Sequence, residues 1–350
     1  MKYIYIEIMC CPKCKSDLQL LKDHKISGDR IESGVLKCSL ESCGIGYPII
    51  NFVPRFVDHG EYAQSFGDQW ETFAKTQIDN TQFQETKERW DSEIGWQESD
   101  LNGSSVIEFG CGAGRFLDIV SKSGASLAVG VDITSAVDAA QNTLGKNDNI
   151  FIVQADFFHL PFKKNYFDYA YSIGVLHHTP DPRKSFSNMV EVVNDKGEVG
   201  LSLYEISLYE RPPLNSLLNA SKDLMWAINM WRVELFRIGT TRVPDKWFLS
   251  YCKYFVPILH YLNKIPVIRY LRYLFPSTCY PNLPVEWSML DTNDTYATKI
   301  VHQYRHKEIF QWFMQENIQN IIVHDSIPGW VSLTGGKTYK DAINYKGFLK

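Results

Sequence analysis

The stretch Val106-Ile107-Glu108-Phe109-Gly110-Cys111-Gly112-Ala113-Gly114-Arg115 decides the fold of this chain. Residues 104–109 form a short apolar run that predicts a buried strand, and residues 116–120 show the apolar spacing of an amphipathic helix. A glycine turn between a strand and a helix lets a ligand approach the backbone closely, because no Cβ atom stands in the way. The sequence therefore predicts a ligand-binding loop at residues 110–114.

Three further apolar runs predict the next parallel strands, at residues 127–131, 150–153 and 166–171. In doubly wound sheets the ligand binds at the carboxyl edge of the strands, so the residues that follow each run are candidate site residues. They are Asp132 after the first run, Asp156 and Phe157 after the second, and Ser172, His177 and His178 after the third. A carboxylate 22 residues after Gly110 can accept both hydroxyls of a ribose. The glycine loop lacks the Gly-Lys-Ser/Thr of a P-loop, which disfavours a nucleoside triphosphate.

Taken together, these segments resemble the successive motifs of class I S-adenosylmethionine-dependent methyltransferases. The resemblance covers residues 100–205 and implies an α/β fold with a doubly wound, Rossmann-like sheet of seven strands. It implies that Gly110, Gly112 and Gly114 meet the methionine part of the cofactor and that Glu108 reaches the methionine amine through a water molecule. It further implies that Asp132 holds the ribose and that Asp156 faces the adenine amine, with Phe157 and Ser172 beside the cofactor. One departure is the turn at residues 194–198, where the family usually has Lys-Pro-Gly-Gly.

Five of the eight cysteines lie in the first 43 residues. Cys11 and Cys14 form a CxxC pair, and Cys38 and Cys43 form a second pair, which predicts a closed tetrahedral zinc site of structural type. Cys10 is expected to be a bystander. The pattern resembles the small zinc-ribbon domain that partners or is fused to methyltransferases, over residues 1–57. Because the sheet has its own core, cofactor binding is expected to survive loss of the metal.

The remaining segments predict a domain order around the cofactor-binding core at residues 100–205. Residues 58–99 resemble a helical lead over the cofactor, in which Tyr62, Gln69 or Arg89 contacts the methionine carboxylate; aromatic packing on the sheet is the alternative. Residues 206–300 form a helical cap insertion. Residues 301–350 supply a helix at 306–315 and the last two strands, at 318–324 and 330–334.

Composition limits the cellular setting. The net charge is −4, so no global basic field recruits nucleic acid, and no apolar run reaches the ~20 residues of a spanning helix. No signal peptide is recognisable, so a cytoplasmic protein is expected. Residues 211–275 hold ten Lys or Arg and three acids amid many aromatic residues. The first interpretation of this mixture is an ordinary helical cap whose apolar stripes face the sheet, and the alternative is a peripheral membrane contact.

The predicted function is transfer of a methyl group from S-adenosylmethionine to a small or lipid- or sugar-linked acceptor, with zinc in a structural role. His177 or His178 is the candidate base for a hydroxyl acceptor, with helix capping or packing as the alternative. A second hypothesis is an rRNA or tRNA methyltransferase with the ribbon as RNA reader, although the ribbon has few clustered cations. A third is a non-catalytic adaptor that binds the cofactor. The sequence says nothing about oligomeric state.

Overall fold

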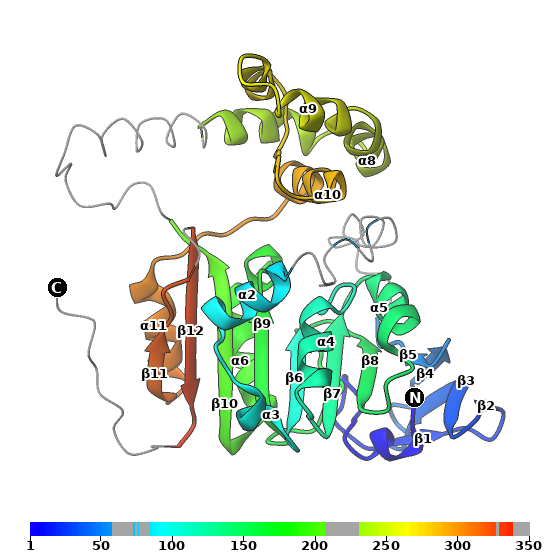
Figure 1. Cartoon of the computed structure of the whole chain (residues 1–350). Helices are drawn as coiled ribbons and strands as arrows, with labels where there is room; N and C mark the ends of the chain where they lie inside the picture. Colours follow the sequence, from blue (N-terminus) through cyan, green and yellow to red (C-terminus); the bar gives the residue numbers. More distant parts are fainter. Residues whose placement is uncertain (58–72, 74–75, 77–83, 207–230, 327–328, 339–350) are drawn as a thin grey trace.

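Seven strands form the central sheet of this chain, for which a computed structural model describes residues 1–57, 73, 76, 84–206, 231–326 and 329–338. Their order is β11-β12-β10-β9-β6-β7-β8 (Figure 1). β10, β9, β6, β7 and β8 run parallel, whereas β12 is antiparallel to both β10 and β11. The strand bounds are Ser105–Phe109 (β6), Leu127–Asp132 (β7), Ile150–Gln154 (β8), Phe167–Ile173 (β9), Val193–Tyr204 (β10), Gln319–Val323 (β11) and Trp330–Gly336 (β12). The predicted α/β fold with a sheet of seven strands is confirmed.

Apolar residues alternate along these strands and so build two layers on opposite faces of the sheet. Val106, Ala128 and Ile150 belong to one cluster, with the helices on that face. Ile107 and its neighbours on adjacent strands belong to the other cluster. The first layer consists of α2 (Glu85–Glu93), α3 (Glu98–Leu101), α4 (Arg115–Lys122) and α5 (Ala136–Leu144). The second layer holds α6 (Pro182–Val192) and α11 (His306–Gln315), and the 3-10 turn η3 (Leu176–His178) precedes α6.

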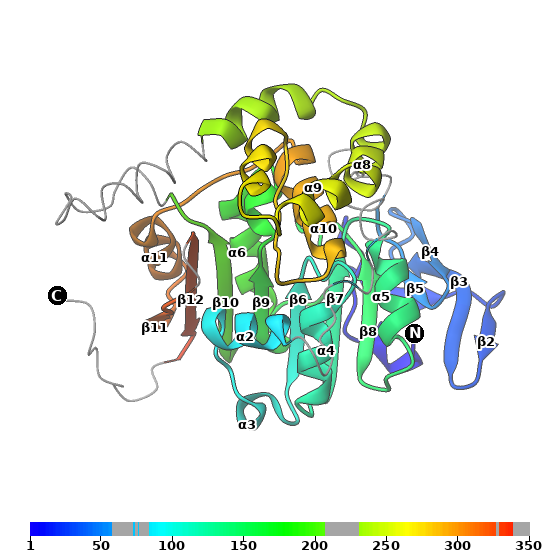
Figure 2. The same ribbon diagram turned by 45° about the horizontal axis from the view of Figure 1, so that its top comes forward.

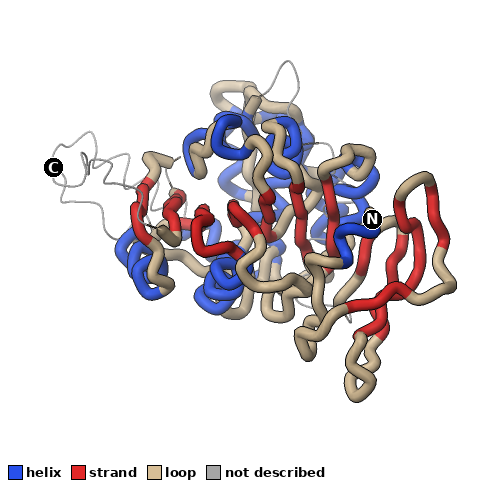
Figure 3. The backbone as a smooth tube through the Cα atoms, turned by 90° about the horizontal axis from the view of Figure 1, so that it is seen from below, coloured by secondary structure: helices blue, strands red, loops and turns tan. Residues whose placement is uncertain are grey.

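The N-terminal unit (residues 1–57) packs into the second of these layers. It contains the 3-10 turn η1 (Tyr3–Ile6) and the strands β1 (Leu18–Leu20), β2 (Lys25–Ser27), β3 (Arg30–Cys38), β4 (Gly46–Ile50) and β5 (Val53–Pro54). Tyr5 stacks on Phe151 of β8, with ring centroids 4.6 Å apart. Phe56 N donates to Gln154 O at 2.8 Å, so the chain after β5 lies against the edge strand β8. Figure 3 shows the unit beside the sheet. It is therefore part of one hydrophobic core with the sheet rather than a separate body.

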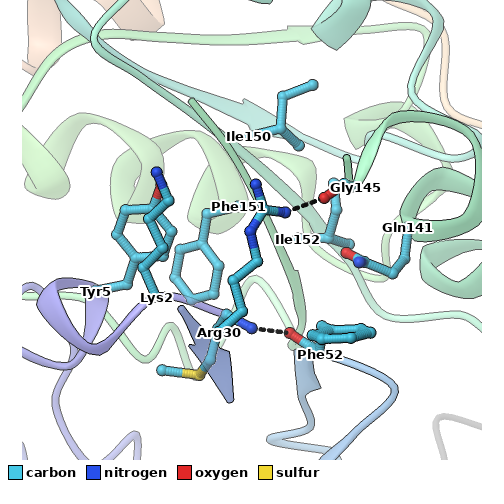
Figure 4. A pocket seen from close by; sticks show the side chains of 10 residues that line it. Lys2, Tyr5, Arg30, Phe52, Gln141, Gly145, Ile150, Phe151 and Ile152 are labelled. Carbon is cyan, nitrogen blue, oxygen red and sulfur yellow. Dashed lines mark hydrogen bonds between the residues drawn. The ribbon is translucent and has the colours of Figure 1, made fainter. Parts of the chain in front are cut away.

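A small cavity lies in the joint between the N-terminal unit and the sheet (Figure 4). Lys2, Tyr5, Arg30 and Phe52 line it from one side, and Gln141 and Phe151 are among the residues on the other. Its volume of about 10 Å³ is that of roughly one water molecule. The cavity is therefore too small for a cofactor or an acceptor.

A helical segment (residues 231–300) lies beyond the carboxyl edge of the sheet (Figures 1 and 2). It comprises helical residues 231–240, α8 (Asp245–Tyr254), α9 (Val256–Leu262), the 3-10 helix η4 (Ile268–Leu274) and α10 (Val285–Ala297). The buried faces of these helices pack mainly on one another, around Phe248, Cys252 and Tyr296. Within the described ranges, no helix has the length and apolar character needed to cross a membrane.

The structure moves several of the predicted strand boundaries. β9 continues to Ile173, two residues beyond the expected end, because Ala170 to Ile173 stay buried between β6 and β10. Ser172 therefore lies inside a strand and not in the loop after it. Helix α11 covers the expected residues 306–315, and the last two strands lie at 319–323 and 330–336. Of the predicted helical lead, Tyr62 and Gln69 lie outside the described residues.

Candidate functional site

The glycine loop between β6 and α4 forms the floor of the candidate site. Gly110, Gly112 and Gly114 have φ values of +81°, +50° and +90°, a region that side chains disfavour. A Cβ on Gly110 would lie 2.3 Å from a methyl carbon of Val175, so only glycine is accommodated there. The loop follows directly from the buried strand β6, and its last glycine begins α4. This is the predicted loop geometry.

The structure brings Asp132 to this loop. Gly112 N donates to Asp132 Oδ2 at 3.0 Å, and both the backbone N–H and the hydroxyl of Thr134 donate to Oδ1, at 2.9 and 2.8 Å. Burial raises the pKa of Asp132, and these three donors oppose that shift. Asp132 is thereby fixed at the carboxyl end of β7, facing the loop as the sequence indicates.

Asp156 and Phe157 follow the neighbouring strand β8. Asp156 Oδ1 accepts from Phe158 N at 3.0 Å, and its side chain keeps 23% of its surface exposed. Phe157 is buried, and its ring packs against Phe109 with centroids 5.3 Å apart. Asp156 is therefore available to a ligand at the same edge as Asp132, whereas the Phe157 ring supports the strand that carries the glycine loop.

Glu108 is a buried carboxyl beneath the loop. It is 2% exposed, and burial raises its pKa to about 8, against the opposing influence of Tyr171 and Arg115. Glu108 Oε2 has no hydrogen-bond partner within the described part of the chain. A buried carboxylate oxygen without a partner is costly, and a bound ammonium group would satisfy it. The residues present therefore fit the amino-acid end of S-adenosylmethionine.

The two histidines occupy different environments at the turn η3. His177 is fully buried, its ring lies 3.9 Å from that of Tyr204, and burial holds its pKa well below the usual range. His178 Nδ1 donates to Ile300 O at 2.9 Å, and burial lowers its pKa to about 4. Both rings are therefore neutral near pH 7. Ser172, the third predicted residue of this strand end, is buried and donates its hydroxyl to Phe109 O at 2.8 Å.

Helix α10 adds a polar cluster that the sequence motifs do not indicate. Asp291 Oδ2 accepts from Tyr280 Oη at 2.5 Å, and burial raises the pKa of Asp291 to about 6. Asp294 follows one turn later, and burial raises its pKa as well. Arg89 on α2 and Arg115, the first residue of α4, lower the pKa of both aspartates. Helix α10 therefore faces the start of α4, which directly follows the glycine loop. A usable signal was the polar run Asp291-Thr292-Asn293-Asp294 inside a helix whose residues are largely buried.

Arg89 on α2 reaches the same region. Its Nε donates to Glu93 Oε1 at 2.6 Å, and its guanidinium lies 3.9 Å from the centre of the Trp330 ring. Nη2 is buried without a hydrogen-bond partner among the residues that the structure describes. An unsatisfied guanidinium nitrogen suits a carboxylate or another acceptor group of a ligand. Arg89 therefore stays a candidate for the methionine carboxylate.

The sulfur atoms of Cys11, Cys14, Cys38 and Cys43 all lie within 4.8 Å of one another. Cys11 and Cys43 are 3.8 Å apart and Cys14 and Cys38 are 3.4 Å apart. Four thiolates around one zinc ion at ~2.3 Å would be about 3.8 Å apart, so the spacing fits a tetrahedral ion. Cys10 lies outside this group, since its thiol donates to Phe162 O at 3.2 Å.

Comparison with known proteins identifies the region that carries this site. Residues 107–201 match the family described as methyltransferase domain. The match spans the glycine loop and the ends of β7, β8 and β9. It confirms the prediction that this region of the chain is a methyltransferase domain.

Several solved structures show partial likeness. A complex of the Trm112 methyltransferase activator with a methyltransferase from Haloferax volcanii is 11% identical, with 79% of this chain and 100% of that chain covered and a TM-score of 0.42. Magnesium protoporphyrin IX methyltransferase from Synechocystis PCC 6803, with bound SAH, is 16% identical, with 79% and 97% covered and a TM-score of 0.42. An S-adenosylmethionine-dependent methyltransferase from Mesorhizobium loti is 15% identical, with 68% and 92% covered and a TM-score of 0.40. At these scores the likenesses carry no information on the acceptor.

Proposed function

We propose that this chain methylates a small or lipid- or sugar-linked acceptor that binds between the carboxyl edge of the sheet and the helical segment. The polar cluster on α10 supports this proposal, because it places carboxyl and phenol groups opposite Arg115, which adjoins the glycine loop. Carboxylates beside tyrosine hydroxyls suit an acceptor with several hydroxyl groups. The N-terminal unit, in this proposal, holds a structural zinc ion and takes no part in the chemistry.

The cofactor supplies an activated methyl group, which moves in line to the acceptor nucleophile. In this proposal the residues of the sheet edge bind and orient the cofactor: Glu108 pairs with its ammonium group, Asp132 with its ribose hydroxyls and Asp156 with its adenine amine. The glycine loop allows the close approach that this pairing needs. Positioning of the two reactants supplies most of the rate enhancement in such a displacement.

A hydroxyl acceptor loses its proton during the transfer, and Asp291 is the base that we favour. Its pKa of about 6 leaves it ionised at neutral pH and close to the range in which a base works well. His178 is the alternative: since its Nδ1 carries the proton given to Ile300 O, Nε2 is the basic nitrogen. Its pKa of about 4 makes it a weaker base than Asp291. His177 is enclosed on all sides, so we assign it a packing role.

Methyl transfer from labelled S-adenosylmethionine tests the acceptor class. The enzyme is incubated with a cell extract that is then separated into lipid, small-molecule and RNA fractions. Label in the lipid or small-molecule fraction is expected, and label confined to RNA would replace this proposal with the RNA alternative. With the acceptor in hand, Asp291→Asn should lower kcat at least tenfold, whereas a larger loss in His178→Asn would assign the base to the histidine.

The helical segment further supports a peripheral membrane contact. Trp231, Trp247, Tyr254 and Val267 are 73–84% exposed. Residues 231–274 contain eight Lys or Arg and two acids. Exposed aromatic side chains beside basic ones favour the surface of an anionic bilayer. The first interpretation of the sequence, in which the apolar stripes all face the sheet, does not account for these exposed side chains.

Sedimentation with liposomes tests this contact. Binding to vesicles with anionic lipid and little binding to neutral vesicles are expected, with the difference decreasing as salt is added. Trp247→Glu should weaken binding, whereas Leu40→Glu, which introduces the same acid at an exposed apolar residue of the N-terminal unit, should not. Equal and negligible binding to both kinds of vesicle would reject the membrane contact and leave the acceptor proposal standing.

A further inference from the structure

Arg55 joins the N-terminal unit to two elements of the cofactor-binding core. Its side chain is 15% exposed and follows directly after β5. Arg55 Nη1 donates to Gln154 Oε1 at 2.7 Å, and Arg55 Nη2 donates to Asp138 Oδ1 at 2.6 Å. Gln154 ends β8 and Asp138 lies in the first turn of α5. One guanidinium therefore holds two core elements through charge-assisted hydrogen bonds, which are the strong ones.

One partner of Arg55, Gln154, lies next to the two acids assigned to the cofactor. Gln154 precedes Asp156 by two residues, and its Nε2 donates to Ile133 O at 3.0 Å, directly after Asp132. The backbone links the same two strand ends, since Ala155 N donates to Asp132 O at 3.0 Å. A displacement of Gln154 would therefore be transmitted to both acids.

We propose that Arg55 is a positioning residue for the cofactor, through which the N-terminal unit fixes the loops that carry Asp132 and Asp156. This inference rests on the proposed assignment of those acids to the ribose and the adenine. Arg55 does not contact the cofactor itself. It sets the separation of the two strand ends, because its planar fork bonds Gln154 on one side and Asp138 on the other.

Arg30 provides a matched comparison in the same joint. Its side chain is 16% exposed, and it too connects the N-terminal unit to the segment around α5. Its partners, however, are Gly145 O and the following residues at the C-terminal end of that helix, with Arg30 Nη2 2.8 Å from Asp148 Oδ1. That end leads into the start of β8, at the edge opposite the cofactor site. Loss of Arg30 should weaken the joint without moving Asp132 or Asp156.

The experiment measures ligand affinity and stability together. The full chain and the variants Arg55→Ala, Arg55→Lys, Arg30→Ala and Asp132→Ala are titrated by calorimetry with S-adenosylhomocysteine and with 5′-methylthioadenosine. The second ligand has the adenine and ribose but lacks the amino-acid group. Thermal unfolding of each variant reports the loss of stability.

We expect Arg55→Ala to weaken both ligands by the same factor, about tenfold, the effect of one charged hydrogen bond. Arg55→Lys should weaken both ligands less than Arg55→Ala does, since lysine restores the charge beside Asp138 but cannot make both hydrogen bonds. If the alanine variant does not fold, the lysine variant tests the positioning role instead. Arg30→Ala should lower the unfolding temperature by a similar amount and change affinity less than twofold.

Equal affinity losses in Arg55→Ala and Arg30→Ala would overturn the proposal, because Arg55 would then stabilise the joint only. A loss for S-adenosylhomocysteine without one for methylthioadenosine would also overturn it. Unchanged affinity in Asp132→Ala is a different result: it would reject the ribose assignment on which the inference rests.

Discussion

Glu108 should make cofactor binding depend on pH. Burial raises its pKa from 4.5 to about 8, so between these values the folded chain holds a proton that the unfolded chain has released. The contribution of Glu108 to stability therefore falls as pH rises through this window. A bound ammonium group favours the ionised carboxylate, so binding expels that proton. Cofactor affinity should rise toward pH 8, by up to about tenfold per pH unit.

Calorimetry with S-adenosylhomocysteine at pH 6 and pH 8 measures this effect in the wild-type chain and in Glu108→Gln. The variant should lose most of the pH dependence, because glutamine cannot ionise. Methylthioadenosine, which has no ammonium group, should bind the wild-type chain with little dependence on pH. The same pH dependence in the wild-type chain and in Glu108→Gln would show that another group carries the proton.

The site residues differ in how well their roles could be predicted from the sequence. Asp132 and Asp156 were predictable because each follows an apolar run, and parallel strands bring such ends to one edge. Asp291 was not predictable in this way, because only the packing of α10 above the sheet edge brings it near Arg115. Arg55 carries no motif, and its importance comes from the pairing of the chain after β5 with β8.

Among the elements, the turn from β6 into α4 tolerates little change. Gly110→Ala would place a methyl group 2.3 Å from Val175 at a φ of +81°, so either the loop or η3 must move. We expect loss of cofactor binding, measured by calorimetry. Gly28→Ala is the matched control: its φ is +62°, but nothing lies within 4 Å of the added carbon. It should cost ~1 kcal/mol of backbone strain and leave affinity unchanged; an equal affinity loss in both variants would contradict a local role for the loop.

The strands and α11 could be predicted from apolar runs and their polar or glycine ends, because those patterns are local. The end of β9 could not, since Ser172 reads as a loop residue until its hydroxyl is seen bonded to Phe109 O. The sequence also did not predict which faces of α8 and α9 are exposed to solvent. An apolar stripe in the sequence does not reveal whether it packs on the sheet, on another helix or faces the solvent. Here Phe248 is buried, whereas the adjacent Trp247 is exposed.

For the whole molecule, the decisive feature is the core shared by the N-terminal unit and the sheet. Met9 and Phe56 belong to the same cluster as Val131 and Phe151. The cysteine spacing predicted the four-thiol cluster, but nothing in the sequence indicated that the unit covers β8 and contributes Arg55 to the joint. The expectation that cofactor binding survives loss of the metal assumed two independent cores, and the shared core argues against it.

Loss of zinc should therefore affect the whole chain. We expect about one zinc ion per chain, and Cys14→Ser should release it, because three thiolates hold the ion far less tightly than four. Structural zinc sites contribute ~10 kcal/mol or more to local folding, so the N-terminal unit should unfold and expose the face of β8 that Tyr5 covers. The unfolding temperature should fall, and affinity for S-adenosylhomocysteine should fall at least as far as in Arg55→Ala.

Cys10→Ser is the control, because the Cys10 thiol bonds Phe162 O outside the cluster, and this variant should keep both the zinc and the affinity. Metal analysis that finds no zinc in protein purified without chelators, or a full zinc ion in Cys14→Ser, would contradict the assignment of these four cysteines.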